Sequence, residues 1–270
     1  MRQLNIAVVQ MEPQLGKLEA NVGKMADMIA NIATQQAVDL IVFPELSVTG
    51  YEGGSRFSQF AQRVPGAVTN ILGQHASEFG IYVLIGMAEK EKVETVLYNS
   101  AVLIGPDGAP VGTYRKVHLP AEERLVFRPG YKIAPIETEV GVIGVVLGWD
   151  LAFPEVARNL VLEGAEVLVV PAAWQAQESD MWRTLLVSRA YENGVFVAAA
   201  NRIGEEPSYT FAGQSAVLSP RGEVLAALEE PEEGYVMVRL DMDEVRQVRE
   251  DSQIILARQP GAYRAIVRKY

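Results

Sequence analysis

The chain has 270 residues, of which 49% are hydrophobic and 21% charged, the profile of a globular protein with a sizeable core. A net charge of −10, without any basic stripe, argues against nucleic acid and anionic membranes as partners. The absence of cysteine excludes disulfides and thiol chemistry, and two histidines are too few for a histidine-rich metal site, so no metal or cofactor is expected. No signal-peptide pattern and no membrane-length apolar run is present, which predicts a cytoplasmic protein.

Strand-like and helix-like segments alternate from the start of the chain. An apolar strand over 4–10 precedes hydrophobic residues at helical spacing from 18 to 32, which predict an amphipathic helix. The nearly all-apolar run 39–44 is typical of a strand covered on both faces. A second helix is predicted over 67–79 and a third strand over 81–86.

Two β-hairpins with strong turn residues follow. The first joins strands 97–104 and 110–115 through Gly-Pro-Asp-Gly, and the second joins strands 213–218 and 224–228 through Ser-Pro-Arg-Gly. Further strands and helices are predicted between the hairpins, at 142–148, 154–164, 166–171, 178–193 and 195–200.

The two halves therefore repeat one theme of strand, helix, strand, helix, strand and hairpin. Because no linker rich in proline, glycine or serine separates them, we expect one α/β domain over 1–270, with two mixed sheets packed face to face and covered by helices. The charged, glutamine-containing tail from Val245 onward is expected to pack loosely or to reach a partner subunit.

Two charged residues stand at the ends of predicted strands. Glu45 follows the buried strand 39–44, at the end where α/β sheets place ligands, although a lone glutamate there also fits a helix cap or a solvated loop. Lys116 follows the last strand of the first hairpin and could simply be a surface lysine. The alternative is a catalytic role, because a lysine close to two carboxylates keeps its charge and can stabilise an oxyanion. His118 fits a structural role as well as a catalytic one.

The segment 142–155 is typical of a buried strand, a tight turn and a helix start. Such a strand-to-helix elbow is a position where a nucleophile can be presented, yet the residue there is Gly148, which has no side chain. The simpler interpretation is a turn glycine chosen for positive φ, with Asp150 and Glu155 capping the next helix.

Taken together, these segments resemble the nitrilase, or carbon–nitrogen hydrolase, superfamily over nearly the whole chain. The motifs that carry the resemblance are AVVQM at 7–11, FPEL at 43–46, LYNS at 97–100, YRKVHL at 114–119, WD and FPE within 149–155, ANR at 200–202, FAGQS at 211–215 and SPRG at 219–222.

The resemblance implies a four-layer αββα sandwich that pairs through one face into a homodimer or larger assembly. It also implies a Glu-Lys-Cys triad that attacks non-peptide C–N bonds of small molecules, as in amidases and carbamoylases. Glu45 matches the general base and Lys116 the residue that supports the tetrahedral intermediate. Glu123 matches a second, substrate-orienting glutamate, with Glu122 as the competing choice, and the backbone N–H of Trp149 matches an oxyanion-hole donor.

The sequence departs from this pattern at the nucleophile, because the family's cysteine falls on Gly148. Acyl transfer through a thioester needs a thiolate, and losing a triad nucleophile costs a factor of order 10⁶ in kcat, so we expect an inactive or strongly impaired hydrolase. Three interpretations remain open: an engineered knockout, a natural pseudoenzyme that binds a small molecule or regulates, and a hydrolase in which Glu45 activates water beside Lys116.

The substrate pocket is expected to include Tyr51, Glu122 and Trp174, although the two aromatic rings are as compatible with core packing. The negative surface favours a small neutral or cationic amide-like ligand. A structural interaction protein, whose function is its dimer face, is the alternative from a different class.

Overall fold

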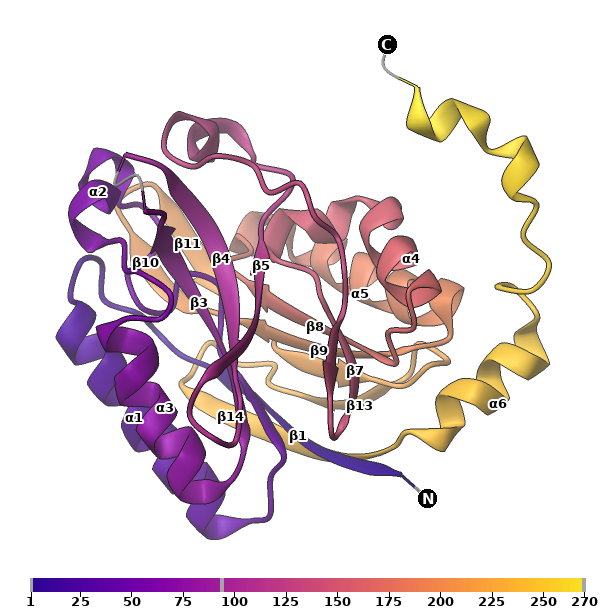
Figure 1. Cartoon of the computed structure of the whole chain (residues 1–270), viewed down its shortest axis with the longest axis horizontal. Helices are drawn as coiled ribbons and strands as arrows, with labels where there is room; N and C mark the ends of the chain where they lie inside the picture. The colour runs from indigo at the N-terminus through magenta and orange to yellow at the C-terminus, as the bar shows by residue number, and fades with distance from the viewer. Residues whose placement is uncertain (1, 93–94, 269–270) are drawn as a thin grey trace.

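Two six-stranded sheets pack face to face, and helices cover the outer face of each (Figure 1). The computed structural model describes residues 2–92 and 95–268. The expected four-layer αββα sandwich is therefore confirmed, with both sheets mixed in strand direction.

The first sheet contains parallel neighbours at its centre and antiparallel strands at both edges. Its strands, in spatial order, are β14 (Gly234–Asp241), β1 (Gln3–Gln10), β2 (Leu40–Val42), β3 (Tyr82–Lys90), β4 (Leu97–Ile104) and β5 (Pro110–Arg115). The second sheet repeats this plan in the order β13 (Val224–Ala227), β12 (Ala216–Leu218), β9 (Phe196–Asn201), β8 (Val167–Ala172), β7 (Gly141–Val145) and β6 (Ile136–Thr138).

The outer layers are amphipathic helices. On the first sheet, α1 (Leu18–Gln35) and α3 (Ala67–Phe79) lie side by side, and α4 (Pro154–Leu162) and α5 (Ser179–Asn193) do so on the second. The shorter α2 (Phe57–Phe60) and α6 (Asp243–Ser252) lie at the periphery. Each helix pair buries an apolar stripe against its sheet, which gives two further hydrophobic clusters outside the central one.

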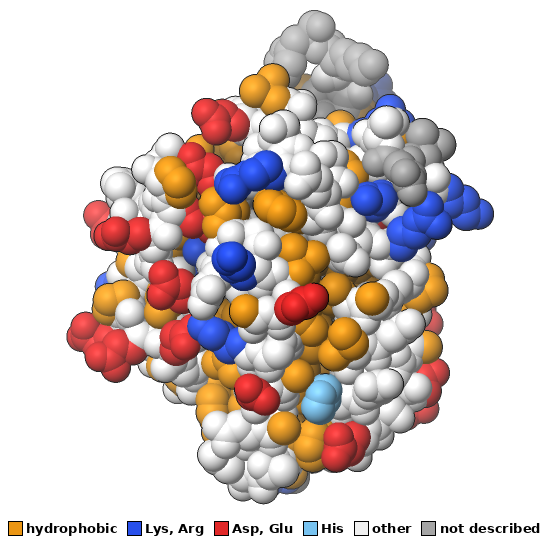
Figure 2. Space-filling view, turned by 90° about the vertical axis from the view of Figure 1, so that its left-hand side faces the viewer, with side chains coloured by type: hydrophobic (Ala, Val, Ile, Leu, Met, Phe, Trp, Pro, Cys, Tyr) orange, Lys and Arg blue, Asp and Glu red, His pale blue; other side chains and the backbone are white. Residues whose placement is uncertain are grey.

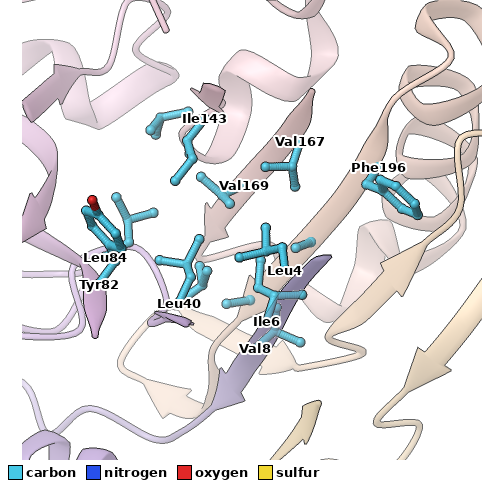
Figure 3. Packing of buried hydrophobic residues seen from close by; sticks show 14 of the residues in the cluster. Leu4, Ile6, Val8, Leu40, Tyr82, Leu84, Ile143, Val167, Val169 and Phe196 are labelled. Carbon is cyan, nitrogen blue, oxygen red and sulfur yellow. The ribbon is translucent and has the colours of Figure 1, made fainter. Parts of the chain in front are cut away.

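The central core fills the space between the sheets. Leu4, Ile6 and Val8 of β1 point toward residues of the second sheet such as Val167 and Val169 of β8 (Figure 3). The alternation of strand side chains explains this arrangement, because the intervening residues of the same strands face the helices.

Five features of the fold were not predicted. These are the short helix α2, strand β6, the small hairpin of β10 (Ile203–Glu206) and β11 (Tyr209–Ala212), the edge strand β14 and helix α6. The tail is in part better packed than expected, because α6 buries Val245 and Val248, whereas most of 253–268 is exposed.

The surface on the side of α1 and α3 mixes acidic, basic and apolar side chains without a continuous block of one charge (Figure 2). Within residues 2–92 and 95–268, no helix is both long and apolar enough to cross a membrane.

Candidate functional site

Glu45 lies in a sharp turn directly after β2, where the chain passes close to β3. Gly86 of β3 permits this approach, because a Cβ at that position would lie 2.7 Å from both the Glu45 Cα and the Leu46 nitrogen. Leu46 itself adopts a positive φ of 50°, an uncommon conformation for a branched side chain. Backbone strain of this kind persists where the surrounding structure imposes it.

The carboxylate of Glu45 accepts hydrogen bonds from three different segments. Its Oε1 accepts from the Lys116 Nζ at 2.7 Å and from the Asn99 Nδ2 at 2.8 Å. Its Oε2 accepts from the backbone N–H of Ala173 at 3.0 Å, just after β8 of the second sheet. Because only 1% of Glu45 is exposed, these donors replace the water that the carboxylate loses on folding.

Lys116 brings a second carboxylate into the same cluster. Its Nζ lies 2.7 Å from Oε1 of Glu123, which belongs to the 3₁₀ helix η2 (Ala121–Leu125). The hydroxyl of Tyr51 donates to the same oxygen at 2.9 Å, and Asn99 Nδ2 lies 3.2 Å from Oε2. Segments that are far apart in the sequence thus converge on one buried group of charges.

The cluster holds two carboxyl groups around one ammonium. Burial lowers the pKa of Lys116, but the nearby Glu123 and Glu45 outweigh it and leave that pKa above its ordinary value. Burial raises the pKa of Glu123, and repulsion from Glu45 raises it further. The attraction of Lys116 lowers it but does not outweigh these two effects. The ammonium is therefore retained, and Glu123 holds a proton more readily than an exposed glutamate does.

The elbow after β7 approaches this cluster from the second sheet. Gly148 opens the 3₁₀ helix η3 (Gly148–Ala152) with a φ of +50°, a conformation that favours glycine. A Cβ at this position would overlap the Glu45 carboxylate, with the Glu45 Cδ only 2.8 Å away. The carboxylate of Glu45 therefore occupies the space in which a side chain at position 148 would begin.

Asp150 ties the elbow to the segment that carries Lys116. It accepts hydrogen bonds from the Tyr114 hydroxyl at 2.7 Å and from the backbone N–H groups of Val117 and His118 at 3.1 and 2.8 Å. The His118 Nδ1 also lies 2.7 Å from its Oδ1, so His118 has a partner that its sequence neighbourhood did not reveal. The interpretation of Asp150 as a mere helix cap is wrong, because its carboxylate bonds across to the other sheet's loop.

A cavity of about 290 Å³ lies beside the charged cluster. Tyr51, Glu122 and Glu123 line it, as does Gln175. Trp174 was expected in this wall, but its ring is buried in the core beside α5, with its Nε1–H donated to the Glu178 carbonyl.

Trp149 lines a second cavity, of about 470 Å³, together with His118. Its backbone N–H lies in the first turn of η3, where helical N–H groups lack partners inside the helix. Its role as an oxyanion donor stays a prediction.

Sequence reasoning missed two residues that organise the site. Asn99 bridges both glutamates, and its only sequence signal was its place in the LYNS motif. Glu206 of β10 accepts the backbone N–H of Tyr51 at 2.9 Å and forms an ion pair with buried Arg202, which holds the Tyr51 loop in place. Across the part of the chain that the structure describes, no group of three or more His, Asp or Glu side chains is arranged to hold a metal ion.

Comparison with known proteins identifies the family of the chain. The family model for carbon-nitrogen hydrolases matches residues 5–250. A probable nitrilase from Schizosaccharomyces pombe is 36% identical over 97% of this chain and 98% of its own length. An (R)-stereoselective amidase from a Pseudomonas species is 32% identical over 92% and 89%. A double mutant of the amidase from Nesterenkonia sp. AN1, solved in complex with acrylamide, superposes with a TM-score of 0.87 at 26% identity, covering 99% of this chain and 98% of its own. The protein therefore belongs to the carbon-nitrogen hydrolase family.

Proposed function

We propose that this protein binds a small neutral or cationic amide-like molecule at the Glu45–Lys116–Glu123 cluster and does not turn it over through a covalent acyl intermediate. The observation that carries the proposal is the contrast at the elbow. The charged groups are assembled and hydrogen-bonded, whereas Gly148 has no side chain and its side-chain space holds the Glu45 carboxylate.

The chemistry of the cluster suits an amide group. The Lys116 ammonium can donate to a carbonyl oxygen, and a buried ammonium in a water-poor site interacts with that oxygen more strongly than it would in water. The carboxylates of Glu45 and Glu123 can accept the amide N–H groups. The relative from Nesterenkonia sp. AN1 was solved with an amide, acrylamide, which supports this ligand class.

The charge of the neighbouring cavity favours a ligand without a negative charge. Glu52, Glu122 and Glu123 line it together with the phenol rings of Tyr51 and Tyr209. An anionic substituent placed there would meet like charges, whereas a neutral or ammonium-bearing one would not.

Isothermal titration with a panel of small amides and carboxylates tests the proposal. We expect propionamide and 4-aminobutanamide to bind, and succinamate, which carries an anionic end, to bind more weakly than either. No heat with any member of the panel, together with the absence of ligand density in crystals soaked with the same amides, would refute the binding function.

We also propose that the protein self-associates. Leu256, Ile266 and Val267 are exposed in the C-terminal segment 253–268, which curves along the outside of the molecule (Figure 1). Covering such side chains with a second copy would remove apolar area from water. Light scattering of the full chain should give at least twice the 29.6 kDa of one chain, and a monomeric mass at micromolar concentration would contradict this.

A further inference from the structure

Asn99 is a buried side chain whose amide nitrogen has hydrogen-bond partners, whereas its amide oxygen has none among the described residues. It lies in β4 with 1% of its surface exposed, and its backbone carbonyl accepts from the Lys116 N–H at 2.9 Å. Its Nδ2 contacts Glu45 and Glu123, but its Oδ1 has no hydrogen-bond partner among the described residues. A buried acceptor without a partner is uncommon and costs stability, so it calls for an explanation.

The orientation of the amide follows from its surroundings. Nδ2 lies 2.8 Å from Oε1 of Glu45, an oxygen that already accepts from Lys116. Turning the amide over would place two acceptors against each other at that distance. The free atom is therefore the oxygen, an acceptor that is available only to an incoming donor.

Lys116 offers the complementary group. Its ammonium carries three protons, and its described side-chain partners are the two glutamates, so one donor is unused. One spare donor and one spare acceptor match the edge of a carboxamide or a ureido group, which presents a carbonyl oxygen and an N–H. A carboxylate presents acceptors only and would leave the Asn99 oxygen unpaired.

Building on the proposed function, we propose that the Oδ1 of Asn99 accepts an N–H from the ligand's carboxamide or ureido group. Asn99 is then a specificity-determining residue, which makes the site select amides over ketones and carboxylates of the same shape. A site that holds a buried polar group for one ligand rejects the analogue that cannot pair with it.

Titration of the wild-type protein with three ligands of similar shape is the first test. Propionamide carries both a carbonyl and an N–H, butanone replaces the amino group by methyl, and propionate carries acceptors only. We expect propionamide to bind at least about tenfold more tightly than butanone. Propionate should bind most weakly of the three. Equal affinity for propionamide and butanone would overturn the inference and leave the proposed function standing. Failure of all three to bind would overturn both.

A variant assigns the preference to Asn99. Asn99→Leu keeps a similar shape but has no acceptor, and we expect its propionamide-to-butanone affinity ratio to fall to within about threefold of unity. Asn193→Leu is the matched control, because Asn193 is also buried and also has an Oδ1 without a partner among the described residues, but its Nδ2 donates to the Arg189 backbone carbonyl within α5, outside the site. Its ratio should equal that of the wild type. An unchanged ratio in Asn99→Leu would overturn the inference.

A crystal structure of the wild-type protein with propionamide gives a second measurement that needs no variant. The amide nitrogen should lie within hydrogen-bond distance of the Asn99 Oδ1, with the carbonyl oxygen facing Lys116. An amide nitrogen bonded only to the glutamates would overturn the inference even if Asn99→Leu fails to fold.

Discussion

The first sheet brings charged and amide side chains to the site, whereas the second sheet brings backbone groups. Glu45, Asn99 and Lys116 follow or belong to β2, β4 and β5. From the other side, the Ala173 N–H binds Glu45 and Gly148 contributes a bare turn. One half of the site is thus rich in buried charge, and the other half adds none to the cluster.

This difference shows why the two halves tolerate change unequally. Removing one member of a buried charge cluster leaves its partner without compensation, which is strongly destabilising. A missing side chain at the elbow leaves no charge unpaired. Glycine also adopts the left-handed backbone conformation at this position without steric strain. The fold therefore tolerates an elbow without a side chain while it keeps the charged residues around it.

Gly148→Cys should produce the largest effect, because it supplies the absent thiol to the second sheet's half of the site. The Glu45 carboxylate must shift to admit the new Cβ, and the thiol then lies directly beside a carboxylate that can accept its proton. We expect measurable amide hydrolysis, with a gain of up to about a factor of 10⁶ in kcat. Ammonia release from a broad amide panel measures it.

Gly80→Cys is the control for this experiment, since Gly80 also has a positive φ, of +66°, but lies at the end of α3 with nothing near its Cβ position. It should remain inactive. A Gly148→Cys protein that is folded and thiol-reactive yet inert toward the whole panel would contradict the prediction and favour a long-standing loss of activity.

Lys116→Met tests the charged half. The substitution leaves Glu45 and Glu123 buried without their cation, and we expect a loss of about 3–5 kcal/mol in the free energy of unfolding. Urea denaturation at neutral pH measures it. Lys132→Met, at an exposed position, should change stability by less than about 0.5 kcal/mol. Equal stability of the two variants would show that the cluster is not an interdependent unit.

Gly148→Ala separates backbone strain from the clash with Glu45. Alanine at either Gly148 or Gly80 must adopt a left-handed conformation, at a cost of about 1–2 kcal/mol. At Gly148 the new Cβ also displaces a hydrogen-bonded carboxylate, for about 1 kcal/mol more. Thermal and urea unfolding of both variants give the comparison, and equal losses would mean that Glu45 moves aside without cost.

The smallest effect expected is a pH dependence that traces to Glu123. Because burial raises its pKa above the ordinary value of 4.5, the protonated carboxyl stabilises the fold, and this contribution is lost as pH rises through the folded-state pKa. Relative to Glu123→Gln, the wild-type protein should therefore lose stability between pH 4.5 and pH 8. Urea unfolding at both pH values measures the change. The variant Glu122→Gln, at an exposed position, should show the same change in stability with pH as the wild type. A rise in wild-type stability relative to Glu123→Gln over this pH range would contradict the prediction.

Much of the fold could be predicted from hydrophobic periodicity. The long amphipathic helices and the apolar strands were identified because their patterns are determined locally. The hairpin of β10 and β11 escaped notice because its strands have only four residues each. Edge strand β14 escaped because it is only half-buried, so its pattern is weak.

Some residues of the candidate site were predictable from the sequence, but their contacts were not. Glu45 and Lys116 were found because each ends a predicted strand, and the structure brings them together. The bond from Asn99 to both glutamates and that from Asp150 to His118 join positions separated by 24 to 54 residues, and no local pattern specifies such pairs. The position of the Trp174 ring likewise depends on packing against α5, which periodicity does not reveal.

The Glu45 carboxylate, bonded from both sheets at once, also has an evolutionary consequence. Selection for folding alone would preserve it and Lys116 long after any benefit from chemistry had ended, since each protects the other from unpaired burial. Glycine and cysteine codons can differ by a single base. A gene with such a codon at position 148 could therefore gain a cysteine at the elbow by one point substitution, with Glu45 and Lys116 maintained in the meantime by stability.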